Sequence, residues 1–82
     1  MWYIISNMTN DNNETIRKEL GEKIKKAREK AGLTQSEVAA AADINVSYYA
    51  QIERGEVNPS FEKLHSITKV LKLKSFDILK KS

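Results

Sequence analysis

The sequence predicts an all-α protein folded as a compact bundle of about five helices. In the first half of the chain, apolar residues recur at intervals of three and four, the period of a helix with one buried face. Three capping residues, Thr34, Asn45 and Ser60, each stand before another short apolar-periodic stretch. The single proline, Pro59, falls between two of these stretches and breaks neither.

The composition indicates one globular domain. The chain has 82 residues, of which 40% are hydrophobic and 30% are charged. It contains no cysteine, which excludes a disulfide framework and fits a reducing compartment, so we expect a cytoplasmic protein. No apolar run is long enough to span a bilayer, and we expect no membrane partner.

The residue types needed for catalysis are scarce. The chain has one histidine, His65, which we expect to be a surface or half-buried residue, and no cysteine to join it in a metal cluster or a Cys-His nucleophile. The three glycines are scattered and form no phosphate-binding loop. We therefore expect no enzymatic activity, no metal and no cofactor.

Residues 1–13 are predicted to be a flexible or arm-like extension, and residues 14–82 the domain. The segment Met1–Ile5 is apolar and strand-like, but it is too short for a signal peptide and lacks the basic start. Two alternatives stay open for this segment. It is either a frayed tail or an arm that packs on a partner subunit, because exposed apolar residues would otherwise be a liability.

The first helix is expected to begin after a cap at Asn13 and to run from Glu14 to about Lys30. Gly21 weakens this helix slightly and marks a place where another element packs closely. The apolar stripe repeats at spacings of four, four, three and four, with members Ile16, Leu20, Ile24, Ala27 and Ala31.

Residues 34–55 are predicted to form two short helices joined by a tight turn. Thr34 and Glu37 have the spacing of a capping box, which starts a helix at Gln35. The chain turns at Asp43–Ile44, and Asn45 can cap the second helix. Helices this short need outside partners, and a buried side of the second is predicted from positions i, i+3 and i+4, which are Tyr49, Ile52 and Glu53.

Two helices are expected after Pro59. Ser60 can cap the first of them, and Ser75 a last short helix. The buried face of the helix after Ser60 is predicted to consist of Phe61, Leu64, Ile67, Thr68 and Leu71.

Three motifs occur at characteristic spacings: LTQSEVA over residues 33–39, QIERG over 51–55 and NPS over 58–60. In combination they resemble the helix-turn-helix of the phage Cro and C1 repressor family, also called the XRE family, from about Leu20 to Leu79. The resemblance implies a lambda-repressor-like fold and a sequence-specific transcriptional regulator, expected to be a repressor, whose partner is a double-stranded DNA operator. The chain departs from the family at Asp43 and Lys72, where glycine is frequent.

The resemblance also implies site residues. The helix at about 46–54 is expected to lie in the major groove. An ion pair is expected between Arg28 and Glu53. The positions that match base-edge contacts are Val46, Ser47, Ala50 and Gln51, with Ser47 and Gln51 expected to read most of the sequence. The positions that match phosphate contacts are Gln35, Asn45, Tyr48, Arg54 and Asn58.

The charge distribution keeps a second function open. The net charge is +3, yet residues 32–59 hold one basic and four acidic residues, and the segments 14–31 and 60–82 supply the positive charge. A DNA-binding surface usually shows a basic stripe. The acidic middle and the apolar N-terminus therefore leave an alternative, a protein-binding module or an antitoxin component with the same fold.

A homodimer is expected, because one helix-turn-helix covers only one half-site of a two-fold operator. The last predicted helix is more apolar than its own docking requires. Some of the apolar residues near the C-terminus are therefore predicted to form the dimer contact. The candidates are Leu73, Phe76, Ile78 and Leu79.

Overall fold

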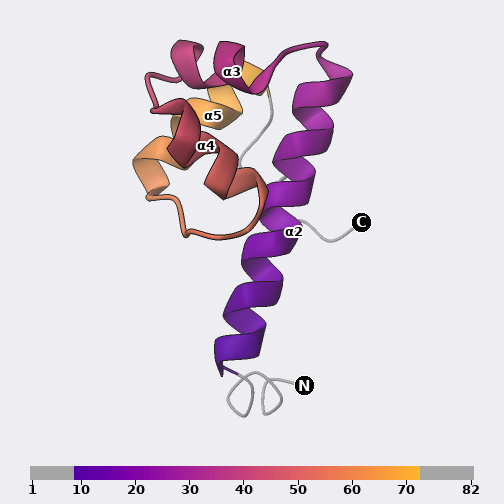
Figure 1. Ribbon diagram of the computed structural model, residues 1–82, viewed down its shortest axis with the longest axis vertical. Helices are drawn as coiled ribbons and strands as arrows, with labels where there is room; N and C mark the ends of the chain where they lie inside the picture. The colour runs from indigo at the N-terminus through magenta and orange to yellow at the C-terminus, as the bar shows by residue number, and fades with distance from the viewer. Residues whose placement is uncertain (1–8, 73–82) are drawn as a thin grey trace.

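Helix α2 (Thr9–Lys30) is the long element against which the other helices assemble. The computed structural model describes residues 9–72, and the remaining elements are α3 (Gln35–Ala41), α4 (Val46–Glu53) and α5 (Phe61–Leu71). Figure 1 shows the second half of α2 beside the three short helices and its first half extending beyond them. All described elements are helical, as predicted.

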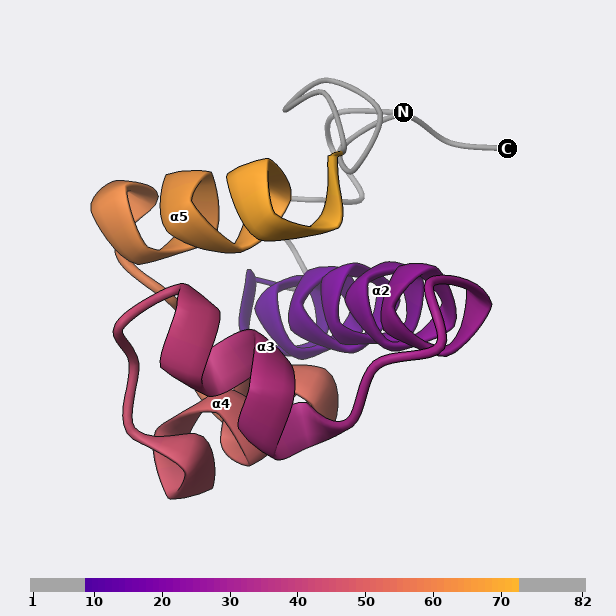
Figure 2. The same ribbon diagram turned by 90° about the horizontal axis from the view of Figure 1, so that it is seen from above.

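The three short helices each pack against a particular neighbour. Helix α4 packs against both α2 and α3, and α3 packs against α5. Figure 2 shows α5 on the side of the bundle opposite α4, with α3 between them. This order leaves α4 at the edge of the bundle, where one of its sides can stay accessible.

The core lies where these helices meet. Its fully buried large side chains come from all four described helices: Ile24, Val38, Tyr49, Ile52 and Ile67. Each buried side chain of this size contributes about 1.5–3 kcal/mol relative to the exposed state. Two small residues, Ala39 on α3 and Ala42 directly after it, are buried and allow this helix to approach its neighbours closely.

Local signals set the helix starts. The Thr34 hydroxyl accepts the amide of Glu37 at 3.1 Å, and the Glu37 carboxylate accepts the amide of Thr34 at 2.8 Å, which completes the predicted capping box. The Ser60 hydroxyl accepts the amide of Lys63 at 3.2 Å. The caps of α3 and α5 were therefore predicted correctly.

Three predictions about α2 were wrong. Helix α2 begins at Thr9, so Asn13 lies inside it and does not cap it. Ile16 is 48% exposed, and Ala31 is exposed past the end of α2, so neither end of the predicted apolar stripe is buried. Residues 9–72 contain four helices, whereas about five were predicted for the whole chain. The predicted last helix and residues 1–8 lie outside the described residues.

Helix α5 was partly mispredicted. Phe61 is 76% exposed, because the first residue of α5 lies past the edge of the core, and its ring stacks on that of His65 with centroids 6.2 Å apart. Ile67, Thr68 and Leu71 are buried as predicted. The hydroxyl of Thr68 donates to the carbonyl of His65 at 2.7 Å, which satisfies this buried polar group.

Two residues with a left-handed backbone conformation stand just after α3 and α5. The backbone has φ of +59° at both Asp43 and Lys72, the two positions where the sequence departs from the family that it resembles. After α3, the amide of Asp43 donates to Ala40 and that of Ile44 to Ala39, the two bonds of a Schellman ending. A side chain in this region is unfavourable, although Asp tolerates it better than most residues.

We predict that Asp43→Gly raises the free energy of unfolding by about 0.5–1 kcal/mol, because glycine removes the Cβ clash at positive φ. Urea denaturation would measure the change. Ala40→Gly is the matched control, since Ala40 is exposed within the same helix and glycine there should lower stability by about 0.5–1 kcal/mol. A loss of stability for both variants would contradict the prediction.

Candidate nucleic-acid interface

Helix α4 is held at its first turn by Asn45. The Asn45 side-chain oxygen accepts the amide of Ser47 at 2.8 Å and that of Tyr48 at 3.2 Å. These bonds satisfy two of the amides that the start of a helix leaves without partners. The cap leaves the amide nitrogen of Asn45 as a donor at the same end of α4.

Helix α4 has a buried and an accessible side. Tyr49, Ile52 and Glu53 are buried, with relative exposures of 0%, 1% and 7%. The four residues predicted at base-edge positions share the remaining surface: Val46 and Ser47 are exposed, and Ala50 and Gln51 are half-buried. The geometry thus leaves these side chains accessible from outside the bundle.

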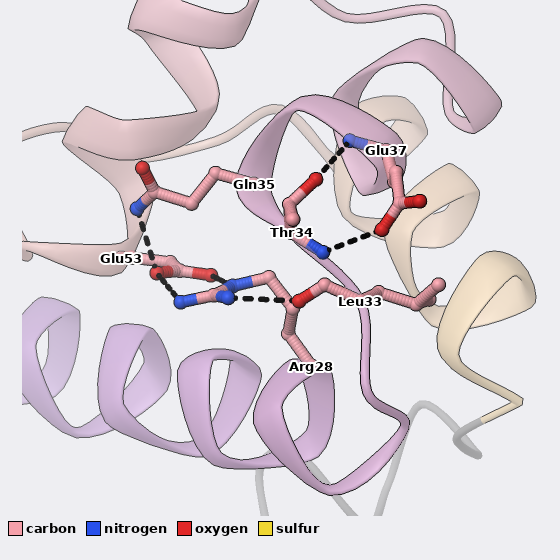
Figure 3. A network of polar contacts seen from close by, with 6 residues as sticks. All are labelled: Arg28, Leu33, Thr34, Gln35, Glu37 and Glu53. Atoms are coloured by element: carbon pink, nitrogen blue, oxygen red, sulfur yellow. Dashed lines mark hydrogen bonds and ion pairs between the residues drawn. The ribbon is translucent and has the colours of Figure 1, made fainter.

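A buried ion pair joins α4 to α2. Arg28 Nε lies 2.7 Å from Glu53 Oε2, and Arg28 Nη2 lies 3.2 Å from Glu53 Oε1. The side chains are 13% and 2% exposed, respectively. Figure 3 shows the two charged groups facing each other between the helices.

The same carboxylate also binds α3. The side-chain nitrogen of Gln35 donates to Glu53 Oε1 at 2.9 Å, and Arg28 Nη1 donates to the carbonyl of Leu33 at 2.9 Å (Figure 3). Glu53 therefore connects α2, α3 and α4, and Arg28 adds the segment between α2 and α3. The network fixes the orientation of α4 relative to the other helices.

The protonation state of Glu53 follows from these contacts. Burial by itself would raise the pKa of the carboxyl group, but hydrogen bonds from Arg28 and Gln35 outweigh it, and the pKa lies below its ordinary value. Glu53 is thus ionised at neutral pH. The hydrogen bonds that Arg28 donates to Glu53 raise the pKa of Arg28 in turn.

Tyr49 lies in the core beside this network. Its hydroxyl is buried and has no partner of hydrogen-bond geometry within residues 9–72. Burial raises the pKa of Tyr49 well above its ordinary value, and the nearby carboxylate of Glu53 raises it further, so the phenol stays neutral. Tyr49 consequently acts as a large core residue of α4.

Close backbone packing seats the end of α4 on α2. A Cβ at Gly21 would come within 2.5 Å of the carbonyl oxygens of Ile52 and Glu53. Gly55 is equally restricted, because a Cβ there would lie 2.8 Å from the Cα of Lys18. Arg17 Nε donates to the carbonyl of Gly55 at 3.2 Å and ties the residue after α4 to α2. The expectation of close packing at Gly21 is confirmed.

The residues predicted at phosphate positions have different surroundings. Gln35 donates into the bundle to Glu53, and the half-buried Tyr48 has Lys63 Nζ 6.0 Å from the centre of its ring. Asn58 is exposed in the loop before α5. The exposed Arg54 donates to both carboxylate oxygens of Glu56, at 2.8 and 3.1 Å.

Two pairs were not predicted from the sequence: Glu56 with Arg54, and Lys63 with Tyr48. Glu56 is exposed and paired with Arg54. The glycine between Arg54 and Glu56 is the local signal that could have indicated this pair, because glycine permits a tight turn that brings its neighbours together. Lys63 and Tyr48 come from different helices, and nothing in their spacing indicates that they are neighbours.

The described part of the chain offers little for other chemistry. Across residues 9–72, no three His, Cys, Asp or Glu side chains gather as metal ligands would. None of the helices of this segment is both long enough and apolar enough to cross a membrane.

The sequence matches the family described as helix-turn-helix over residues 24–79. It is 37% identical over 60 residues to the HTH-type transcriptional regulator DdrOP3 of Deinococcus deserti, a match that covers 73% of this chain and 46% of that protein. It is 38% identical over 52 residues to the immunity repressor protein of Bacillus phage phi105, covering 63% of this chain and 36% of the repressor. The chain thus spans less than half the length of these two curated relatives.

A solved structure has the same fold. The crystal structure of the clp gene regulator ClgR from Corynebacterium glutamicum superposes with a TM-score of 0.76 at 31% sequence identity. The superposition covers 78% of this chain and 68% of that one.

We predict that Glu53→Ala lowers the free energy of unfolding by about 3–5 kcal/mol, because it leaves the charge of Arg28 nearly buried and without its carboxylate. That loss is a large part of the stability of a small domain. Glu56→Ala is the control, since Glu56 is also paired with an arginine but in solvent, and its effect should be small. Thermal unfolding of both variants measures the difference, and equal small shifts would contradict it.

Proposed function

This chain belongs to the helix-turn-helix family, and we propose that it is a sequence-specific DNA-binding transcriptional regulator that acts as a repressor. The observation that carries the proposal is the accessible side of α4, whose orientation is fixed by the Arg28–Glu53 pair. A recognition helix must be held rigidly if its side chains are to meet base edges. The names of the matched relatives, regulators and a phage repressor, support the same function.

In this proposal, α4 enters the major groove with its N-terminal part towards the bases. Gln51 can bind adenine through two hydrogen bonds, and Ser47 can bond to several bases. Val46 and Ala50 offer apolar contact to a thymine methyl group. The remaining surface of α4 thus combines polar readout with apolar contact.

Phosphate contacts are assigned to residues around this helix. Asn45 has a donor left after capping α4, Tyr48 has its hydroxyl, and Asn58 is exposed in the next loop. Arg54 lies directly after α4, and Gln35 begins α3. Such contacts position a protein on the duplex and carry no sequence information themselves.

The acidic balance of residues 32–59 is compatible with this function. Glu53 is buried in the network, and Glu37 on α3 is engaged in the capping box. Neither carboxylate therefore stands without a partner beside the accessible side of α4. The positive charge comes from the segments 14–31 and 60–82. Neutral donors and helix N-termini can hold phosphates without a net charge of their own.

We predict that two substitutions impair DNA binding in different ways. Gln51→Ala should cost about 1–3 kcal/mol on the cognate operator and little on random duplex, because a base contact carries sequence information. Arg54→Ala should weaken binding to the operator and to random duplex by a similar factor, because a phosphate contact carries no sequence information. It should also reduce the slope of log affinity against log salt concentration by about one unit. Salt titrations on an operator selected from random sequences measure both effects.

The selection itself is the decisive control. If it enriches no sequence, and only salt-sensitive binding to any duplex remains, the proposal fails. A protein-binding module or antitoxin component would then explain the fold better.

We also propose that the chain acts as a homodimer, with part of the set Leu73, Phe76, Ile78 and Leu79 as the contact; these residues lie outside the described range. The two half-sites should lie about one DNA turn, roughly 34 Å, apart. Analytical ultracentrifugation should show a dimer at micromolar concentrations. A monomer at high micromolar concentration, with and without operator DNA, would rule the dimer out.

A further inference from the structure

Arg54 forms an ion pair whose geometry resembles a phosphate contact. Its Nε lies 2.8 Å from Glu56 Oε2, and its Nη2 lies 3.1 Å from Glu56 Oε1. The arginine fork meets carboxylates and phosphates in this same two-point manner. In the free protein, Glu56 therefore occupies donors that a phosphate would use.

The backbone brings these two side chains together. Arg54 ends α4 in a helical conformation, and Gly55 follows with φ of +74°. The amide of Glu56 donates to the carbonyl of Gln51 at 2.9 Å, which folds the chain back over the end of the helix. Glu56 is thus held next to Arg54 by the helix ending itself.

The pair is exposed, so it can exchange partners. The Arg54 and Glu56 side chains are 56% and 50% exposed, respectively. An exposed ion pair is worth little, because water and salt screen it. A phosphate on a duplex, with the strong field of its neighbours, can displace a single carboxylate from such a pair.

Arg54 supplies the positive charge of the segment that contains α3 and α4. It is the one basic residue between positions 32 and 59. Two of the four acidic residues in this range, Glu37 and Glu53, are engaged in the capping box and the buried network. Glu56 is the acidic residue that neutralises Arg54.

We propose that Glu56 is an internal competitor for DNA phosphate at Arg54 and thereby lowers the affinity of this protein for duplex DNA of any sequence. This inference rests on the proposed function, because competition arises only if Arg54 contacts a phosphate. Glu56 acts through Arg54 and touches no DNA itself. Its effect must therefore disappear when Arg54 is removed.

A double-mutant cycle on random duplex DNA at low salt tests this dependence. Glu56→Gln should tighten binding about two- to fivefold, the range that an exposed ion pair can supply. In the Arg54→Ala background, the same substitution should change the affinity by less than about twofold. Glu62→Gln is the charge-matched control, since Glu62 is exposed in the first turn of α5, and its gain should be smaller.

The outcomes separate the inference from the function on which it rests. Equal gains from Glu56→Gln with and without Arg54, or an equal gain from Glu62→Gln, would show general repulsion of DNA and overturn the inference. Wild-type binding with no gain from Glu56→Gln would also overturn it, while the proposed function stands. Failure of every variant to bind any duplex would reject the proposed function, and the inference with it.

Discussion

The buried carboxylate of Glu53 is the interaction on which the arrangement of the helices depends. It receives hydrogen bonds from Arg28 on α2 and from Gln35 on α3, while it belongs to α4 itself. An ionised carboxylate without such partners would be costly in the interior. The three helices are therefore held in the one orientation that satisfies this charge, and the accessible side of α4 takes its direction from it.

Packing and polar contacts act together at the end of α4. The absence of a side chain at Gly21 lets the last carbonyls of α4 approach α2, while Arg17 holds the carbonyl of Gly55. Both contacts lie within one turn of the Glu53 carboxylate along α4. Because a close-packed interior resists small displacements, the C-terminal end of the helix is fixed from several directions. The N-terminal end depends on the Asn45 cap and on Tyr49 in the core.

The engaged acidic residues explain how an acidic helix-turn-helix is compatible with an anionic partner. Two of its four carboxylates are engaged without occupying Arg54: Glu53 is buried against Arg28 and Gln35, and Glu37 accepts a backbone amide. The buried charge of Glu53 is balanced by Arg28, which lies outside the segment, so the formal charge of the segment overstates the negative charge at its surface. The excess of positive charge lies in the segments 14–31 and 60–82 of the sequence.

The sequence by itself determined the features that depend on residues within a few positions of one another. The capping box at Thr34, the caps at Asn45 and Ser60 and the buried side of α4 were all predicted from local spacing. The family motifs likewise indicated the pairing partner of Arg28.

Only the tertiary structure decided which surfaces have a partner. Ile16 and Phe61 have helical spacing, yet both are exposed, because periodicity defines a face and does not show whether another element covers it. The bond from Gln35 to Glu53 and the fit of Gly21 against α4 join residues far apart in the chain. Such contacts depend on the packing of whole helices, which the spacing within any one helix does not determine.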